Sequence, residues 1–598
     1  MRPAALQEAP ASSEAARTLK ALAPAAVIFL AAAIAVLPSL GGGFVFDDHG
    51  LIEDSALLRG PLWRIWLTTE PVDFWPLTYT TLWLDWRAWG TGPLGYRLLN
   101  VALHAATATL LWRVLRRLAV PGAWLAGLLF AVHPATVESV AWISERKNVL
   151  SGALFAGAVL VWLRHRASRR TGWYVAALAT FLLALLAKTS TVMLPVVLLG
   201  IALWQRGRLE RRDLVETAPF FALSLALGAV TVWFQQVRSL AGARLPRGLE
   251  ERVGGAAWAL LSYLRTALVP VDIPLVAAPW PVGSAEPLFW APLAIVLAAA
   301  GVLAWGRRGP LRPVSFALGY HALMVLPVLG LVDMAYLRLA PVASHLQYVA
   351  LMGPVALAAA ALARLASGPR RSAALAASGV LALALAAASA LRSTAFRDDL
   401  AYWEAAARGA PQSRVAALRL ADELGARGRV PEARAVLAGA AARLRDPADR
   451  LRAEAILLVH SRRFAEGLAA AGAAEQVRTD PFFQRDLGEL LIQAGRFDDA
   501  IAVLEPVVRA HPNSAEHRYW LGSALALAGR LPEAAEVVRV ACGQSRGHFG
   551  TCTAFVMVLA RMGQADRARA ELASALALSP WDAEVERLLA ESGVPEAR

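Results

Sequence analysis

Two adjacent carboxylates stand just past the first long apolar run of the chain, in a segment that reads FVFDDH from Phe44 to His49. Asp47 and Asp48 are suited to accepting a proton or holding a cation where a membrane helix meets water. His49 and Glu53 add further titratable groups close by. The same residue types are common at helix N-caps and in solvated loops. The spacing alone therefore leaves a catalytic role and a structural role open.

A second charged group lies further along, in a stretch that reads HPATVESVAWISERKNVLS. Ionisable side chains at membrane depth are unfavourable, so they usually face a polar cavity or each other. Cations on the outer side also run against the usual bias of basic residues toward the cytoplasm, which makes a bound anion such as a lipid phosphate a natural partner. A purely structural ion pair of Glu145 with Arg146 or Lys147 is the alternative. The candidate residues are His133, Glu138, Glu145, Arg146, Lys147 and Lys188.

The elements that must position these groups are membrane helices. Of the 598 residues, 57% are apolar and only 18% are charged, a composition that excludes a soluble protein of this size. The net charge of +14 lies in short clusters between apolar runs, which argues against a nucleic-acid surface. The chain has no P-loop, HExxH, GxSxG or Rossmann glycine pattern.

Apolar runs long enough to cross a bilayer recur eleven times. A further run at 256–268 is short and contains Arg265, and we expect it to be re-entrant or interfacial. The predicted spans are 22–40, 95–115, 121–141, 148–164, 172–187, 190–205, 216–235, 287–305, 313–332, 343–365 and 372–391.

Basic clusters give the predicted orientation of these spans. All of them fall inside if residues 1–21 are a cytoplasmic N-terminal segment and 256–268 does not cross. The membrane domain then extends over 22–395, with an extracytoplasmic loop at 41–92, and the odd number of spans places the C-terminal region outside. The clusters lie at 113–117, 164–170, 206–212, 307–312 and 364–371.

The C-terminal region, 396–598, carries a countable period. Such a period is typical of tetratricopeptide repeats, in which each helical hairpin buries its apolar face against its neighbours. We therefore predict an all-α protein, in which a polytopic helical membrane domain precedes an α-solenoid of about five repeats. The two cysteines, Cys542 and Cys552, are expected to be buried repeat residues instead of a disulfide. Arg429, Arg463, Arg496, Arg530 and Gln564 are separated by 34, 33, 34 and 34 residues.

The chain resembles the transmembrane and tetratricopeptide-repeat O-mannosyltransferases and their bacterial relatives, within the GT-C class of polyprenyl-phosphate-sugar-dependent glycosyltransferases. The similarity extends over nearly the whole chain, and its most specific stretches lie in the membrane domain. These stretches are Phe44 to His49 (FVFDDH), Phe74 to Gly90 (FWPLTYTTLWLDWRAWG), Gly95 to His104 (GYRLLNVALH), His133 to Ser151 (HPATVESVAWISERKNVLS) and Lys188 to Pro195 (KTSTVMLP).

The resemblance implies roles for these residues. Asp47 would be the general base that deprotonates an acceptor hydroxyl, with Asp48 orienting it. Two adjacent carboxylates fall short of the six or more oxygen ligands of a divalent-ion site, so neither a metal nor another cofactor is expected. Arg146, Lys147 and Lys188 would stabilise the leaving phosphate, and His49, His133, Glu138 and Glu145 would complete the substrate-binding set.

Two stretches depart from the family pattern. Family members often carry an acidic residue followed by Arg or His where this chain reads Ser344, His345, Leu346, Gln347 and Tyr348, so no donor contact is assigned there. The segment 270–281 also lacks the usual Tyr-Pro-Arg-Trp wording. Mannose and a protein acceptor therefore come from the resemblance alone.

The implied function is transfer of a hexose, mannose in the family, from a polyprenyl-phosphate donor to a hydroxyl of protein Ser or Thr. The reaction would occur on the extracytoplasmic side of a bacterial inner membrane. Expected partners are membrane lipid, the lipid-linked sugar and an acceptor protein or peptide recruited by the repeats, with no nucleic acid. The alternative is a non-catalytic scaffold that displays the repeats for envelope assembly. The acids and cations at the outer boundary favour the enzyme, because an anchor needs neither.

Overall fold

The computed structural model describes residues 12–578, apart from 54, 70, 241–246, 307–308, 445, 478–479, 513 and 545–548. Within these residues every regular element is helical and no strand occurs, which confirms the all-α prediction. Several parts of the sequence predictions lie outside the described residues. They are 1–11 of the N-terminal segment, 54 and 70 of the outer loop, 241–246 of the membrane domain, 307–308 of one basic cluster, and 445, 478–479, 513, 545–548 and 579–598 of the repeat region.

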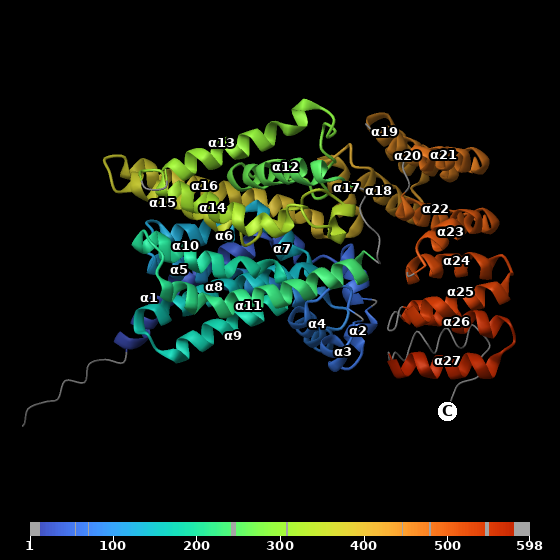
Figure 1. Cartoon of the computed structure of the whole chain (residues 1–598), viewed down its shortest axis with the longest axis horizontal. Helices are drawn as coiled ribbons and strands as arrows, with labels where there is room; N and C mark the ends of the chain where they lie inside the picture. The colour runs from blue at the N-terminus through green and yellow to red at the C-terminus, as the bar shows by residue number, and fades with distance from the viewer. Residues whose placement is uncertain are drawn as a thin grey trace, which may run out of the picture.

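The membrane domain is a bundle of helices that run side by side (Figure 1). Long apolar runs form these helices, and basic residues end several of them, as Arg116 and Arg117 do in the last turn of α5, where a cation also suits the helix dipole. The bundle helices are α1 (Ser12–Ala35), α5 (Pro93–Arg117), α6 (Ala123–Ala131), α7 (Val137–Ala141), α8 (Arg146–Ser168), α9 (Thr171–Ala187), α10 (Leu194–Arg206), α11 (Arg211–Phe234), α12 (Leu249–Leu268), α13 (Ala291–Gly306), α14 (Arg312–Val325), α15 (Met352–Ala366) and α16 (Arg371–Ser393).

Most of the predicted spans coincide with apolar helices. Among the described residues, six helices are long and apolar enough to cross a membrane, or seven if α6 and the segment Pro134–Ala141, bent by 55°, form one span. Three more predicted ranges coincide with the shorter apolar helices Leu22–Ala35, Thr171–Ala187 and Met352–Ala366. In the range 313–332, α14 ends at Val325, and Pro327 follows in the 3-10 turn Leu326–Val328. The total of eleven spans stays a prediction.

The run at 256–268 belongs to one continuous helix, α12, which is not among those six helices. Near its start, Arg252 pairs with Asp333, in the segment that follows α14. At its middle, Trp258 Nε1 donates to the carbonyl of Phe289, just before α13. These contacts hold the first half of α12 against segments at the predicted outer end of the bundle, and the re-entrant or interfacial position stays a prediction.

The predicted outer loop folds into a small helical layer of its own. Its helices are α2 (Ala56–Arg59), α3 (Trp63–Leu67) and α4 (Pro76–Trp89). Apolar side chains from the loop, among them Ile52 and Leu58, pack with Tyr79 of α4 and Tyr96 of α5 into a separate core. The layer sits at the end of the bundle that faces the repeats (Figure 1), and it carries the FVFDDH segment with it.

The described part of the C-terminal region forms five helical hairpins, preceded by α17. They stack beside the outer loop (Figure 1). The first hairpin turn contains Gly428 in the left-handed region, with φ of +74°, and the second repeat places Arg462 in the same conformation with φ of 60°. The helices are α17 (Asp399–Gly409), α18 (Arg414–Ala426), α19 (Val430–Arg443), α20 (Pro447–His460), α21 (Phe464–Val477), α22 (Pro481–Gln493), α23 (Phe497–Ala510), α24 (Ala515–Leu527), α25 (Leu531–Gln544), α26 (Phe549–Arg561) and α27 (Ala565–Leu578).

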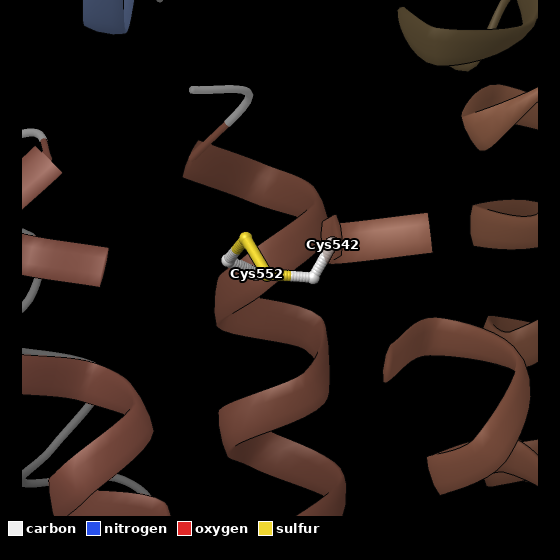
Figure 2. The surroundings of a disulfide bond; sticks show 2 residues. All are labelled: Cys542 and Cys552. Atoms are coloured by element: carbon white, nitrogen blue, oxygen red, sulfur yellow. A yellow bond between two sulfur atoms is a disulfide. The ribbon is translucent and has the colours of Figure 1, made fainter. Parts of the chain in front are cut away.

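The expectation for the two cysteines is wrong, because Cys542 and Cys552 form a disulfide (Figure 2). Cys542 lies near the end of α25 and Cys552 in the first turn of α26. The hairpin stacking brings their Cα atoms to 4.7 Å, a separation that a disulfide can bridge without backbone movement. Sequence spacing could not show this, since it depends on how the last two repeats pack.

The membrane domain and the repeats share one apolar core. Val45 of the outer loop and Trp142, just after α7, belong to the same buried cluster as Tyr402 and Trp403 of α17. The backbone N–H of Gly43 also donates to the carbonyl of Arg397, at 2.8 Å. The outer loop and the repeats therefore lie at the same end of the bundle.

Candidate functional site

The FVFDDH segment turns its two carboxylates in different directions. The residue before the pair, Phe46, has a φ of 52°, a left-handed conformation that is uncommon for a residue with a Cβ. Asp47 is exposed to a cavity between the bundle and the repeats. Asp48 is completely buried. The backbone turn at Phe46 thus separates an acid that solutes can reach from an acid that they cannot.

Asp48 ties the loop to the start of α8. Its Oδ1 accepts from the backbone N–H of Ser144 at 2.7 Å, and its Oδ2 accepts from that of Val45 at 3.2 Å. Burial raises the pKa of Asp48 to about 6, although these hydrogen bonds to the charged form oppose the rise. Asp48 therefore orients Asp47 indirectly, by fixing the loop against the ERKN segment.

Asp47 is the carboxylate placed for chemistry. Protein surrounds the cavity on which it opens, and the resulting loss of hydration raises its pKa, while the Lys147 ammonium opposes the rise. A raised pKa brings a carboxylate closer to the value at which it accepts a proton effectively near neutral pH. The position and the environment of Asp47 both suit a general base.

Two lysines reach the same cavity and share one counter-ion. Lys147 Nζ lies 2.5 Å from Glu145 Oε1 and 4.6 Å from the centre of the Trp75 ring. Lys188 Nζ lies 3.7 Å from Glu145 Oε2 and donates to Asn148 Oδ1 at 2.6 Å. All but Asn148 line the cavity. Two ammonium groups with one carboxylate between them leave a net positive region beside Asp47, which suits an anionic group.

His345 completes this charged cluster from a distant part of the chain. It lies in the 3-10 turn η10 (Ser344–Gln347), and its Nε2 is 3.9 Å from Glu145 Oε1. Its Nδ1 is 2.9 Å from Glu138 Oε2, and Glu138 also pairs with Arg392 at 2.5 Å. Glu138 does not line the cavity; it is buried behind His345 and fixes the ring that does.

Arg146 and His133 do not reach the cavity either. Arg146 is fully buried and pairs with Asp85 Oδ2 at 2.7 Å. Consecutive residues of a helix point about 100° apart, so Arg146 and Lys147 at the start of α8 face different sides. His133 is buried with its Nε2 3.3 Å from the carbonyl of Ala267. Arg146 and His133 therefore lie outside this cavity, and their contact with a substrate stays a prediction.

His49 lines the cavity between two carboxylates. Its Nδ1 is 2.6 Å from Glu53 Oε2, and its Nε2 is 2.7 Å from Asp399 Oδ2, on the first helix of the repeat region. The hydrogen bond to Asp399 is the largest cause that raises the pKa of His49, to about 9, and Glu53 adds to the rise against the effect of burial. At neutral pH the ring is a cation that joins the loop to the repeats.

The cavity has a volume of about 2140 Å³ and extends well beyond this charged cluster. Next to the outer loop, Gln235 donates to Asp73 and accepts from the backbone N–H of Ala335 at 2.9 Å. On the far side the wall is formed by the repeats. The repeat residues that line it include Arg414, Arg419, Asp422, Asp480, Arg485, Asp486 and Glu516. In the described part of the chain, no group of three or more His, Cys, Asp or Glu side chains converges as metal ligands.

Part of the chain is similar in sequence to known proteins. Protein O-mannosyl-transferase Tmtc1 of Drosophila melanogaster is 34% identical over 170 residues, which are 26% of this chain and 20% of the fly protein. Protein O-mannosyl-transferase TMTC3 of Homo sapiens is 31% identical over 160 residues, which are 24% of this chain and 18% of the human protein. The chain is similar to the protein O-mannosyl-transferases. The matches span only about a fifth of the length of these relatives.

The repeats match known proteins separately. The tetratricopeptide repeat family matches residues 485–548, which confirms the repeat type predicted from the period. Among solved structures, YrrB, described as a tetratricopeptide-repeat protein with an unusual peptide-binding site, is 19% identical with a TM-score of 0.23. The similarity covers 32% of this chain and 97% of YrrB.

The sequence did not predict several of the residues that line the cavity. His345 stands in the very segment that departs from the O-mannosyltransferase pattern, so the resemblance gave no reason to select it. Asp73 lies one residue before the FWPLTY stretch that resembles the O-mannosyltransferases, and its carboxylate was the available signal. Asp399 opens the repeat region, and no motif links it to a site about 350 residues earlier.

Proposed function

We propose that the protein is a membrane glycosyltransferase that moves a hexose, mannose by analogy with its relatives, from a polyprenyl-phosphate donor to an acceptor hydroxyl. One observation carries the proposal: the Asp47 carboxylate and the Lys147 and Lys188 ammonium groups open on one cavity. A base and a pair of cations are what a single displacement at a sugar phosphate needs. A scaffold has no use for either.

In the proposed reaction the acceptor oxygen attacks the anomeric carbon of the donor sugar. The new glycosidic bond forms as the bond from that carbon to the phosphate oxygen breaks. Asp47 takes the hydroxyl proton, and the polyprenyl phosphate leaves with the electron pair of the broken bond. Lys147 and Lys188 stabilise the charge that develops on the phosphate, and Glu145 holds both ammonium groups in place before the donor arrives.

The acceptor side of the site is proposed to be the repeat domain, because the repeats form the far wall of the cavity. Solenoids of this type present concave surfaces to extended partners, so a peptide held there would have a path to Asp47. The disulfide between Cys542 and Cys552 supports an extracytoplasmic position for the repeats, since disulfides persist in oxidising compartments. No metal or other cofactor enters the proposal.

The test is transfer of radiolabelled mannose from polyprenyl-phosphate mannose to endogenous protein, in membranes that contain wild type or Asp47→Asn at matched levels. A carboxylate base contributes a factor of about 10² to 10⁴, so the variant should lose nearly all label while its amount in the membrane stays unchanged. Equal labelling by both proteins would exclude Asp47 as the base. If neither polyprenyl-phosphate mannose nor any other hexose donor gave label, the non-catalytic scaffold would be the better explanation of the protein's function.

A further inference from the structure

The first helix of the repeat region holds the segment that carries Asp47. The Asp399 carboxylate of α17 accepts from the backbone N–H of Phe46 at 2.7 Å through Oδ1. Its other oxygen, Oδ2, lies 2.7 Å from His49 Nε2. One carboxylate thus grips the loop on both sides of the residue proposed as the base, from a position about 350 residues away in the sequence.

Aromatic packing strengthens the same grip. The Phe46 ring stacks on Tyr402 of α17 at 5.9 Å between centroids and meets the edge of Trp403 at 5.0 Å. It also stacks on Trp142 of the membrane domain at 5.7 Å, and the Trp142 and Tyr402 rings lie 6.1 Å apart. Left-handed backbone at a residue such as Phe46 persists only where its surroundings hold it. Here α17 supplies both the polar and much of the apolar restraint.

We infer that Asp399 is a positioning residue of the transferase, which acts through Phe46 and His49 to hold Asp47 in the cavity. The inference rests on the proposed function for its catalytic meaning. It makes α17 part of the active site, although the helix belongs to the repeat region in sequence. A base displaced by about 1 Å can lose a factor of about 10² in rate, so the grip matters even though Asp399 touches no substrate.

The charge state of His49 decides how strong this grip is. The charged groups that face His49 are Glu53 on its own turn and Asp399 on α17, and Arg427 of the repeats acts on Asp399 in turn. The hydrogen bond from His49 lowers the pKa of Asp399, against the effect of burial, and keeps it ionised. The ion pair of His49 and Asp399 therefore exists at neutral pH and is lost when the histidine gives up its proton, near pH 9.

The experiment compares Asp399→Asn and Asp399→Ala in the full-length protein with Asp398→Asn as the matched control. Asp398 is the neighbouring acid, and its side chain caps α17 by accepting from the backbone N–H of Ala401 at 2.9 Å. None of the contacts described for Asp398 involves the outer loop. Asparagine is also a good N-cap, so the control keeps the helix. Transfer is measured as kcat and as the KM for the lipid-linked donor, from pH 6 to about pH 10.

We expect both Asp399 variants to lose kcat by about tenfold or more, with little change in the donor KM because Lys147 and Lys188 are untouched. In Asp399→Asn the alkaline limb of kcat, near pH 9 in wild type, should move toward the ordinary histidine value of 6.5. The control should match wild type in both respects. Wild-type kcat and an unmoved alkaline limb in both Asp399 variants would overturn the inference while leaving the proposed function intact.

A second measurement needs no catalysis and separates the two proposals. Hydrogen exchange of the peptide that covers residues 43–49 reports the loop directly, because Asp399 accepts from the N–H of Phe46. Exchange should be faster in Asp399→Ala than in wild type or Asp398→Asn. Unchanged exchange would overturn the inference even if transfer were impaired. Exchange could also be faster in Asp399→Ala while transfer does not depend on Asp47. In that case Asp399 would still restrain the loop, but the proposed transferase function would be rejected.

Discussion

Charged pairs occur in two regions of the molecule under opposite conditions. At the outer end of the bundle, Glu145 meets Lys147 with side chains that are only 3% and 7% exposed. Along the repeats, the arginines that mark the period each pair with an acid three residues later, as Arg530 does with Glu533 at 40% and 57% exposure. The other periodic pairs are Arg429–Glu432, Arg463–Glu466 and Arg496–Asp499.

The contrast shows where charge is informative. Exposed pairs between long side chains gain little, because water and salt screen them and both side chains lose freedom. A buried cluster must offset a large loss of hydration, so it is retained where something else requires it. The regular pairs thus reveal the architecture of the repeats, and the irregular cluster reveals the site. The following experiments test that contrast, from the largest expected effect to the smallest.

Removing the shared counter-ion should have the largest effect on stability. Glu145→Gln leaves Lys147, Lys188 and His345 facing one another without a carboxylate between them. Uncompensated buried charge is destabilising by about 3–5 kcal/mol. Thermal unfolding in detergent should therefore show a clearly lower midpoint for the variant. A midpoint equal to that of wild type would mean that the cluster is hydrated and that the contrast with the repeats is false.

Removing one cation should affect catalysis more than stability. Lys188→Met keeps an unbranched, slightly shorter side chain but loses the charge, and a hydrogen bond to a charged group contributes about 1.5–3 kcal/mol. We expect kcat/KM for the donor to fall by about 10- to 100-fold. The KM for the acceptor should stay the same, as measured by varying each substrate in turn. A change confined to the KM for the acceptor would show that Lys188 contacts the acceptor and not the donor.

The contact between loop and repeats should weaken at alkaline pH. The pKa of His49 in the folded protein is about 9, above its ordinary value of 6.5. The stabilisation is therefore complete below pH 6.5 and is lost as pH rises through 9. The difference in unfolding midpoint between wild type and His49→Gln should shrink over this interval. A constant difference from pH 6 to about pH 10 would show that the ring is not charged in the folded state.

The smallest effect should come from the periodic pairs. Arg530→Ala removes an exposed partner of Glu533, and we expect the unfolding midpoint to move by less than about 2 °C. The transfer rate should not change. A large fall in the unfolding midpoint or in the transfer rate would show that these arginines contribute to stability or to catalysis.

Much of the fold could be predicted because its signals are local or periodic. The spacing from Arg429 to Gln564 predicted five hairpins, and each of them is present in the described residues. Ten of the predicted spans coincide with apolar helices or with the bent pair. The range 313–332 fits less well, because Pro327 follows soon after the end of α14.

The site was harder to predict than the fold, because the type of a residue does not show which way its side chain points. Asp47 and Asp48 are identical in sequence terms, and only the left-handed turn at Phe46 sends one to the cavity and the other inward. Nothing in the sequence favoured Arg146 or Lys147 over the other as the phosphate ligand. In the structure only Lys147 lines the cavity, because the two residues face different sides of α8. His345 and Asp399 arrive by tertiary packing from far along the chain, and no local pattern could reveal them.

The docking of α17 on the outer loop bears on how such proteins can be recombined. In a chimera, one repeat array would replace another. A junction placed directly after α16 would exchange Asp399, Tyr402 and Trp403 together with the array, and so break their fit to Phe46. A junction between Gly409 and Arg414, where α17 has ended and α18 begins, would keep that fit. The interchangeable module therefore starts one helix later than the predicted boundary at residue 396 implies.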